Sequence, residues 1–396
     1  MKRCILTALL CAVILGSCFS PWAGDEGTLT INFGNSGSAR KFVDLENREF
    51  ANFNHTVLLK GVNGNRIEKS FSGAAGVISL PPGVYTMSVK ASDASEVRAY
   101  GIHKGALEIK AGKNVNAKVV MYSAVEVSSG EGLRRAVESI DDSDWHKQFY
   151  ILIGNSFNIN YDNGIPISGK IALVAESEVE INFMPFHFLI YDNFSLGVKD
   201  MPGTITINGF SASGNLIQIM NGEMLMYDSI TIRGNSYGAV SVDANSTFNM
   251  YGGKISGNTV TGNGGGVNVS GTFNMYGGVI SGNTVTGNGG GVYVNGTFNM
   301  IGGEISDNTA NFDVVNSTGG NGGGVYINDA NFSKTGGIIY GNDAESNSNI
   351  ANGFSNPGHA VYAHIPTIQA HYRNSTAGKN IILTVIDGTP SGGWEW

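Results

Sequence analysis

The sequence predicts an all-β protein, in which a parallel β-helix of three short strands per coil follows a small β-sandwich. Three observations predict this fold. The segment TFNMYGGKISGNTVTGNGGGVNVSG (247–271) is followed at once by TFNMYGGVISGNTVTGNGGGVYVNG (272–296), residues 27–122 contain short alternating runs, and glycine accounts for 57 of 396 residues. Self-similarity at a fixed period near 25 residues indicates a stack of coils rather than a flat sheet.

The composition of the chain excludes several classes of protein. Hydrophobic residues make up 41% of the chain and charged residues 14%, so the chain has enough apolar side chains to build a core and is not expected to be disordered. The net charge of -8 gives no basic surface for nucleic acid. The glycines follow no Gly-X-Y period, which excludes a collagen-like chain.

Residues 1–18 have the order of a secretory signal: two basic residues, the apolar run ILTALLCAVIL, and then LGSC (15–18). The run is too short for a membrane span. LGSC resembles the lipobox of bacterial lipoproteins, which implies cleavage before Cys18 and lipidation at that residue. The alternative is an ordinary signal peptide that is cut slightly later.

All three cysteines, Cys4, Cys11 and Cys18, lie in this first segment. The mature chain would therefore keep a single lipidated cysteine, with no disulfide. We expect a protein held on the membrane through Cys18, in the bacterial cell envelope, at the outer membrane or the cell surface. Residues 19–26 are expected to be a linker.

Residues 27–122 contain the runs TLTINF, TVLLKG, GVISL, GVYTMSVKA, ALEIK and NAKVVMY, separated by turn residues. Such spacing is typical of a β-sandwich. The segment resembles the small transthyretin-like or immunoglobulin-like (Ig-like) modules of bacterial surface proteins. That resemblance implies a structural spacer.

A single amphipathic helix is predicted at about 128–141, where Ser128 or Ser129 can cap the first turn and apolar residues recur at helical spacing. A lone helix before a long β region resembles the N-terminal cap of pectate-lyase-like right-handed parallel β-helices. The resemblance implies that the helix covers the open end of the stack, which otherwise exposes strand edges. The solenoid domain is then 123–396, with a C-terminal cap at about 364–396.

Within each repeat, alternation points three sets of apolar residues inward, which predicts three strands per coil and at least six coils. In parallel stacking, equivalent residues lie above one another. We therefore expect an internal aromatic column and an asparagine column at the corner after the isoleucine. These columns are Phe248, Phe273, Phe298 and Phe332, and Asn258, Asn283, Asn308 and Asn342.

The two repeats differ only at the pairs 254/279, 268/293 and 270/295, all of which alternation places on the outside. The recurring TFNM and GGGV elements, over roughly 200–363, resemble the β-helical repeats of bacterial adhesin-like and polymorphic outer-membrane proteins. The Phe-x-x-Asn element of the polymorphic proteins is absent. The resemblance implies a scaffold that presents a variable surface.

The candidate ligand-binding residues are an outward column and one residue of a nearby insertion. The column comprises Ser241, Asn268, Tyr293, Tyr326 and Tyr362, and the insertion, residues 311–319, contains Asp313. Exposed rings in a row offer a surface for the apolar faces of sugars or for a protein partner. Stacked tyrosines that simply stabilise their sheet are the alternative.

Other polar residues suggest chemistry less strongly. Asp307, Asp313, Asp329 and Asp343 cluster in the coils around the insertion and are candidates for a Ca²⁺ or glycan site, with solvated corner carboxylates as the commoner alternative. The histidines His359, His364 and His371 lack a recognisable metal-ligand spacing. We expect no metal and no cofactor.

Together these patterns predict a noncatalytic, monomeric surface lipoprotein that presents a β-helix for adhesion, with a glycan or a host or bacterial surface protein as ligand. The alternative is a polysaccharide lyase or glycosidase of the pectate-lyase-like class, which needs positioned carboxylates or a base.

Overall fold

The structure, a computed structural model, describes residues 26–33, 53–73, 75–94, 96–140, 148–160, 164–184, 187–210, 214–343, 346–353, 357–365 and 371–394. The signal segment with Cys18 and most of the expected linker lie outside these residues. The chain divides into two compact units, one ending at Met121 and one beginning at Tyr122. Within the described ranges, no helix is both long and apolar enough to cross a membrane.

Two sheets form the first unit. In the smaller sheet, β1 pairs antiparallel with β4 and parallel with β8. In the larger sheet, β5 lies between β2 and β6 and also pairs with β7, while β3 borders β2. The bounds are β1 (Gly27–Phe33), β2 (Asn54–Gly61), β3 (Arg66–Ser72), β4 (Ala75–Leu80), β5 (Gly83–Asp93), β6 (Glu96–Ile102), β7 (Leu107–Ile109) and β8 (Asn114–Val119).

One apolar core joins these two sheets. Leu29 and Ile31 of β1 pack in the same cluster as Val57 and Leu59 of β2 and Met87 of β5. Alternate residues of each strand therefore point to a shared interior, as expected for two sheets packed face to face. The predicted sandwich of short alternating strands is confirmed, with a mixed rather than purely antiparallel smaller sheet.

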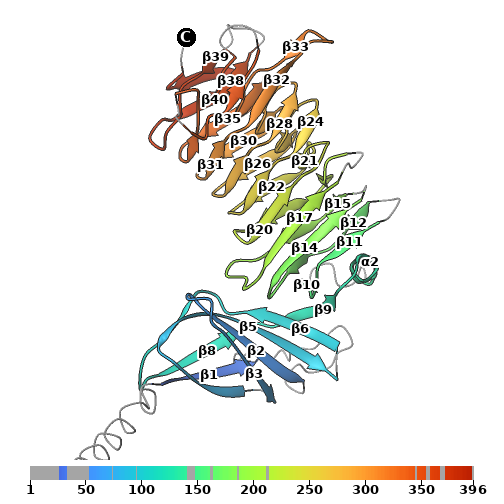
Figure 1. Ribbon diagram of the computed structural model, residues 1–396, viewed down its shortest axis with the longest axis vertical. Coiled ribbons are helices and arrows are strands. Elements are labelled where there is room, and N and C mark those ends of the chain that lie inside the picture. Colours follow the sequence, from blue (N-terminus) through green and yellow to red (C-terminus); the bar gives the residue numbers. More distant parts are fainter. Residues whose placement is uncertain are drawn as a thin grey trace, which may run out of the picture. The chain divides into compact units, whose positions relative to one another are not determined.

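The second unit is a parallel β-solenoid. We call its sheets I, II and III, and one turn that adds a strand to each is a rung (Figure 1). Sheet I contains β9 (Tyr122–Val127), β10 (Phe149–Ile153), β13 (Ile171–Val174), β16 (Asn193–Leu196), β19 (Glu223–Met226), β22 (Thr247–Met250), β26 (Thr272–Met275), β30 (Thr297–Met300) and β35 (Asn331–Lys334). Sheet II contains β11 (Phe157–Ile159), β14 (Glu178–Phe183), β17 (Thr204–Gly209), β20 (Ile230–Arg233), β23 (Lys254–Ser256), β27 (Val279–Ser281), β31 (Glu304–Ser306) and β36 (Ile338–Ile339). Sheet III contains β12 (Ile165–Ile167), β15 (Phe188–Ile190), β18 (Ile217–Ile219), β21 (Val240–Val242), β25 (Val267–Val269), β29 (Val292–Val294), β34 (Val325–Asn328) and β38 (Val361–His364).

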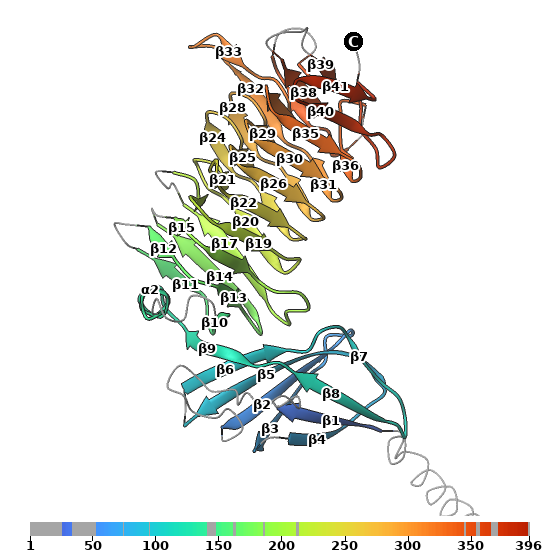
Figure 2. The same ribbon diagram turned by 180° about the vertical axis from the view of Figure 1, so that it is seen from behind.

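The chain makes about seven full turns between β10 and β35, and Figure 2 shows the same stack from behind. Register is strict: Phe248 pairs with Phe273, and Phe273 pairs with Phe298. The predicted solenoid of about 25-residue turns is confirmed. Its first strands lie before residue 200, which is roughly where the recurring elements of the sequence begin.

The later rungs carry a fourth strand. Sheet IV contains β24 (Thr259–Thr261), β28 (Thr284–Thr286), β32 (Thr309–Asp313) and β37 (Ile350–Ala351). Val260, Val285 and Ala310 point inward from it and form a small apolar cluster of their own. The prediction of three strands per coil therefore holds for the early rungs and is incomplete for the later ones.

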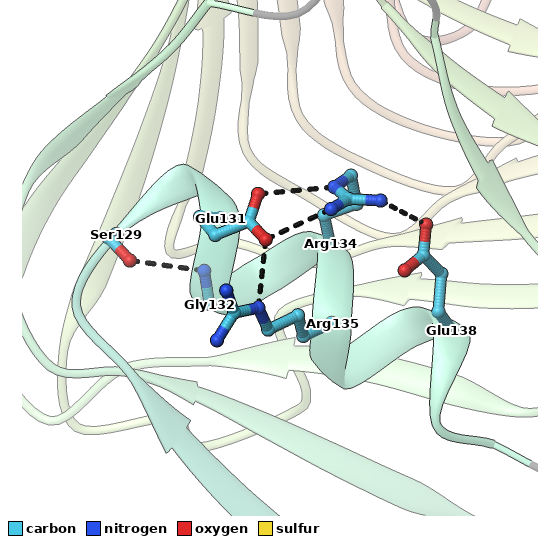
Figure 3. Close-up of polar contacts among 6 residues, drawn as sticks. All are labelled: Ser129, Glu131, Gly132, Arg134, Arg135 and Glu138. Atoms are coloured by element: carbon cyan, nitrogen blue, oxygen red, sulfur yellow. Dashed lines mark hydrogen bonds and ion pairs between the residues drawn. The ribbon is translucent and has the colours of Figure 1, made fainter.

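Helix α2 (Gly130–Glu138) contacts β9, β11 and β12 in the first rungs. Ser129 caps it by accepting a hydrogen bond from the Gly132 amide at 3.0 Å. On the outer side, Arg134 bridges Glu131 and Glu138, while Arg135 also pairs with Glu131 (Figure 3). The buried side carries Leu133, Ala136 and Val137, so the predicted amphipathic helix is confirmed.

The internal phenylalanine column is confirmed. The ring centroids of Phe248 and Phe273, and of Phe273 and Phe298, are 4.9 Å apart, and those of Phe298 and Phe332 are 5.5 Å apart. All four rings are fully or almost fully buried. Stacking of this kind adds to the free energy gained from burying the rings.

The corner asparagine column is also present, with one correction. The Asn258 side chain donates to Oδ1 of Asn283 at 2.9 Å, and Asn283 donates likewise to Asn308. The last member is Asn349, not Asn342 as predicted from spacing, because the chain makes an additional loop after Ile339 before it returns to the corner. Asn342 itself is exposed.

The run of three glycines before β25, β29 and β34 has two causes. Gly264 and Gly289 have φ of +73° and +69°, in the left-handed region that favours glycine. A Cβ on Gly266 would lie 2.7 Å from the carbonyl oxygen of Gly291 in the next rung. The stacked corners therefore leave no room for a side chain at that position.

Antiparallel strands close the C-terminal end. β39 (His371–Arg373) pairs with β38, and β40 (Leu383–Ile386) joins β35 to β41 (Thr389–Gly392). Pro390 lies in the outermost strand, where the missing amide hinders pairing with another chain.

Lys334 ends the internal column that contains Met226, Met250, Met275 and Met300, and it is fully buried. Its Nζ donates to the carbonyl oxygens of Gly378 at 2.8 Å and Ile381 at 2.9 Å. The side chain thus ties the last rung to the C-terminal cap.

The corner column should be more important for stability than a similar row on the surface. Asn283→Ala leaves the buried amide of Asn258 and the carbonyl of Ile255 without their partner, at a cost on the order of 2–4 kcal/mol. The matched control is Asn274→Ala, which removes a half-buried asparagine that donates to Asn249 on the outer face of sheet I. It should cost less than about 1 kcal/mol. Denaturant unfolding combined with local protease protection measures both, and equal losses would contradict the assignment.

The cap should become more stable as the pH rises from about 8 towards 10. Burial, with a smaller contribution from the charge of Arg373, lowers the pKa of Lys334 to about 8. In an unfolded chain it stays near 10.4, so within this window the unfolded chain binds a proton that the folded chain has lost, and the free energy of unfolding rises with pH. Protease protection of residues 371–394 should therefore increase over this range in the native protein. In Lys334→Met it should not, and an identical pH response in the two proteins would refute the assignment.

Candidate functional site

The predicted tyrosine column is present on sheet III. Tyr293, Tyr326 and Tyr362 occupy equivalent register positions, preceded by Ser241 and Asn268. The ring centroids of successive tyrosines are 5.3 and 5.4 Å apart, with interplanar angles of 2° and 8°. The rings therefore stack on one another along the solenoid.

This stacking limits what the column presents to solvent. Tyr326, in the middle, is only 7% exposed, and Tyr293 and Tyr362 are half-buried. Burial raises the pKa of all three phenols, most strongly for Tyr326, whose two neighbours add to the effect. The expectation of freely exposed rings is thus wrong for Tyr326, because the faces cover each other and leave mainly edges and hydroxyl groups accessible.

Tyr372 extends the column beyond the residues found by sequence. β39 pairs antiparallel with β38 and places Tyr372 opposite Tyr362. At the other end, Asn268 lies beside Tyr293 and is smaller than a ring. The repeat template could not find Tyr372, because it lies in the cap and outside the period.

A second aromatic row, which the sequence reasoning missed, is more exposed. Tyr227, Tyr251, Tyr276 and Ile301 each follow the last residue of a sheet I strand, and we call them the tyrosine row. The ring centroids of Tyr227 and Tyr251 are 5.3 Å apart, those of Tyr251 and Tyr276 are 4.9 Å apart, and both pairs are stacked. Tyr251 and Tyr276 are each 44% exposed, and Ile301 is 46% exposed. The sequence signal for this row is the Tyr or Ile that follows each FNM segment. It was missed because this position resembles a turn.

An amide row lies beside the tyrosine row, on the outer face of sheet I. Asn299 donates to Asn274 at 2.9 Å, Asn274 donates to Asn249 at 2.8 Å, and Asn249 donates to the Glu223 carboxylate at 2.6 Å. Each asparagine uses one N–H in this row, which leaves a second N–H donor on the half-buried Asn274 and Asn299, while Asn249 is buried. The outward residues of β22, β26 and β30 are threonine and asparagine, which makes this face uncharged.

The insertion forms a projecting hairpin. β32 continues from sheet IV and pairs antiparallel with β33 (Thr318–Gly319). Asp313 accepts hydrogen bonds from the amides of Val315 and Asn316 and from the Asn316 side chain, and these bonds lower the pKa of Asp313. Its carboxylate therefore holds the turn. The hairpin belongs to sheet IV, whereas Tyr326 belongs to sheet III.

The tip of this hairpin is apolar. Val314 is 79% exposed and Val315 is 86% exposed.

The remaining acidic residues do not converge. Asp307 and Asp329 are exposed corner residues with φ of 55° and 49°, and Asp343 accepts from the amide and hydroxyl of Thr376. Among the described residues, no three His, Cys, Asp or Glu side chains are placed to hold a metal ion.

The histidines are separated as well. His359 accepts a hydrogen bond from the Ala351 amide at its Nδ1, and burial lowers its pKa. His371 is buried edge-on against Trp394, and His364 is exposed.

No protein-family model, curated protein or solved structure matches this chain. The geometry of the tyrosine column on sheet III and of the tyrosine row is therefore the basis for the function proposed below.

Proposed function

We propose that this protein is a noncatalytic, lipid-anchored cell-surface protein that binds a glycan or a protein through the side of its solenoid. The observation that supports the proposal most is the exposed tyrosine row beside the amide row. Both recur rung after rung above an interior that the repeats keep constant.

The chemistry of this surface suits recognition better than catalysis. Tyrosine and asparagine combine large contact area with adaptable hydrogen bonding, as in binding surfaces of other proteins. The absence of charge on the outer face of β22, β26 and β30 favours a neutral, hydroxyl-rich ligand over an acidic polymer. The column on sheet III offers a second, more enclosed surface of related chemistry.

Anchoring would come from the N-terminus. A lipid on Cys18 would hold the chain in the bacterial cell envelope, and along the sequence the sandwich lies between this residue and the solenoid. Stable attachment needs more than one acyl chain, which lipid on both the thiol and the amine of Cys18 would supply.

Ligand binding should depend on the exposed row first. The double variant Tyr251→Ser/Tyr276→Ser should lose at least about tenfold in affinity, since ring contacts at the centre of an interface contribute strongly. The comparison variant is Tyr293→Ser/Tyr326→Ser. An array of neutral and acidic glycans and surface proteins, with circular dichroism as the check of folding, measures both.

Undiminished binding by both folded variants would contradict a role for either tyrosine set. Loss only in the second variant would place the site on sheet III. New reducing or unsaturated ends in an added polysaccharide would favour the alternative, a lyase or glycosidase.

The anchor has its own test. Cys18→Ser should leave the chain unprocessed or mislocalised, because the lipid-accepting thiol is gone. Detergent phase partitioning of cell extracts measures the lipid-bound fraction. An unchanged membrane-bound fraction in the variant would refute lipidation at this residue.

A further inference from the structure

Charge is almost absent from the central rungs, and where it occurs it is ordered. Between Thr247 and Ser306 the only charged residues are Lys254 and Glu304. Each is the first residue of a sheet II strand, and both belong to one register column with Val279 between them. The column reads positive, neutral and negative on three successive rungs.

These two charges do not neutralise each other within the chain. Equivalent residues of successive rungs are about 4.8 Å apart, so the backbones of the two charged residues are about 10 Å apart. No ion pair joins Lys254 and Glu304. Lys254 is exposed, and within the described part of the chain the Glu304 carboxylate accepts only a hydrogen bond from Ser306, at 2.8 Å. Both charges therefore remain available to a partner.

The column is complementary to itself under one symmetry operation. A two-fold axis along the direction of β27 reverses the order of the rungs and keeps the columns aligned. Lys254 then faces Glu304 of a second copy, Glu304 faces the second copy's Lys254, and Val279 meets its own equivalent. Parallel pairing would instead place like charges opposite each other, which is repulsive.

We propose that the outer face of sheet II pairs antiparallel with the same face of a second copy of this chain. Residues beyond the charges also fit this arrangement. On the next rungs outward, Thr231 lies opposite Ile338 of the second copy. The tyrosine row borders this face, because each of its last three members stands three residues before a residue of the charged column. The same two-fold rotation brings Tyr276 towards Tyr276 of the second copy.

The pair is weak and sensitive to salt. Exposed ion pairs contribute little to affinity, and salt screens them. Their main effect is to set orientation and to reject the wrong alignment. The monomer expected from the sequence is therefore the state at low concentration, and many copies on one surface make the weak contact effective through avidity.

Antiparallel pairing has a consequence for adhesion, which rests on the surface anchoring proposed above. The chain enters the solenoid at β9, the first strand of sheet I, so the two copies enter at opposite ends of the pair. Lipid-anchored copies then join two facing membranes rather than neighbours in one membrane. The second copy itself is the ligand of this face.

The test uses beads that carry the mature chain attached by its N-terminus. Wild-type beads should clump, and K254E beads or E304K beads should each clump at least about tenfold less, because like charges then face each other. A mixture of K254E and E304K beads should clump again, since opposite charges are restored, and this also shows that both variants are folded. Beads with K254E/E304K should clump with themselves and not with wild-type beads.

Ser270→Glu, an exposed position that varies between the repeats on another face, is the control and should clump like the wild type. Sedimentation of the soluble chain gives an independent readout, in which dimer should decrease towards about 0.5 M salt. Wild-type beads that do not clump, or charge variants that clump undiminished, would overturn the proposal. If Cys18 proves unlipidated while the soluble chain still pairs, only the bridging of membranes fails.

Discussion

Backbone hydrogen bonds between successive rungs hold each residue of the solenoid above its equivalent one period away. Most side chains in a regular rung therefore have their own kind, or a near relative, as their closest neighbours along the axis. This constraint selects residues that pack well on themselves. Phenylalanine does so through stacked rings, and asparagine does so because its amide both donates and accepts.

The same constraint explains why the central rungs carry so little charge. A lysine or glutamate repeated in register would face like charges on both sides, which is unfavourable between neighbouring strands. Lys254 avoids this because its register neighbours are Thr231 and Val279. Glu304 avoids it because its neighbours are Val279 and Ile338. At the end of the stack the rule changes. Lys334 has no rung above it and finds its partners in the cap carbonyl groups instead.

Sequence reasoning predicted what the period controls. The solenoid, the phenylalanine column and helix α2 follow from spacing and alternation, since these depend on which residues repeat. It missed what depends on the path of the chain between strands. Asn349 takes the place predicted for Asn342 because a loop intervenes whose length the repeat period does not specify. The TVT segments are too short to be recognised from sequence as strands of a separate sheet.

The site was harder to predict for a related reason. Alternation places Tyr326 on the outside, yet the stacked neighbours bury it. The tyrosine row follows its strands at a turn, where alternation gives no direction. Cys18 lies outside the described residues and stays a prediction.

The near identity of residues 247–271 and 272–296 also bears on how this chain can change in length. Duplication or loss of one such segment would add or remove one complete rung without disturbing the register of the others. Loss of the second copy would bring Lys254 directly next to Glu304, within reach of an ion pair inside the same molecule. Changes in copy number would therefore alter the reach of the solenoid and the charge pattern on its side in a single step.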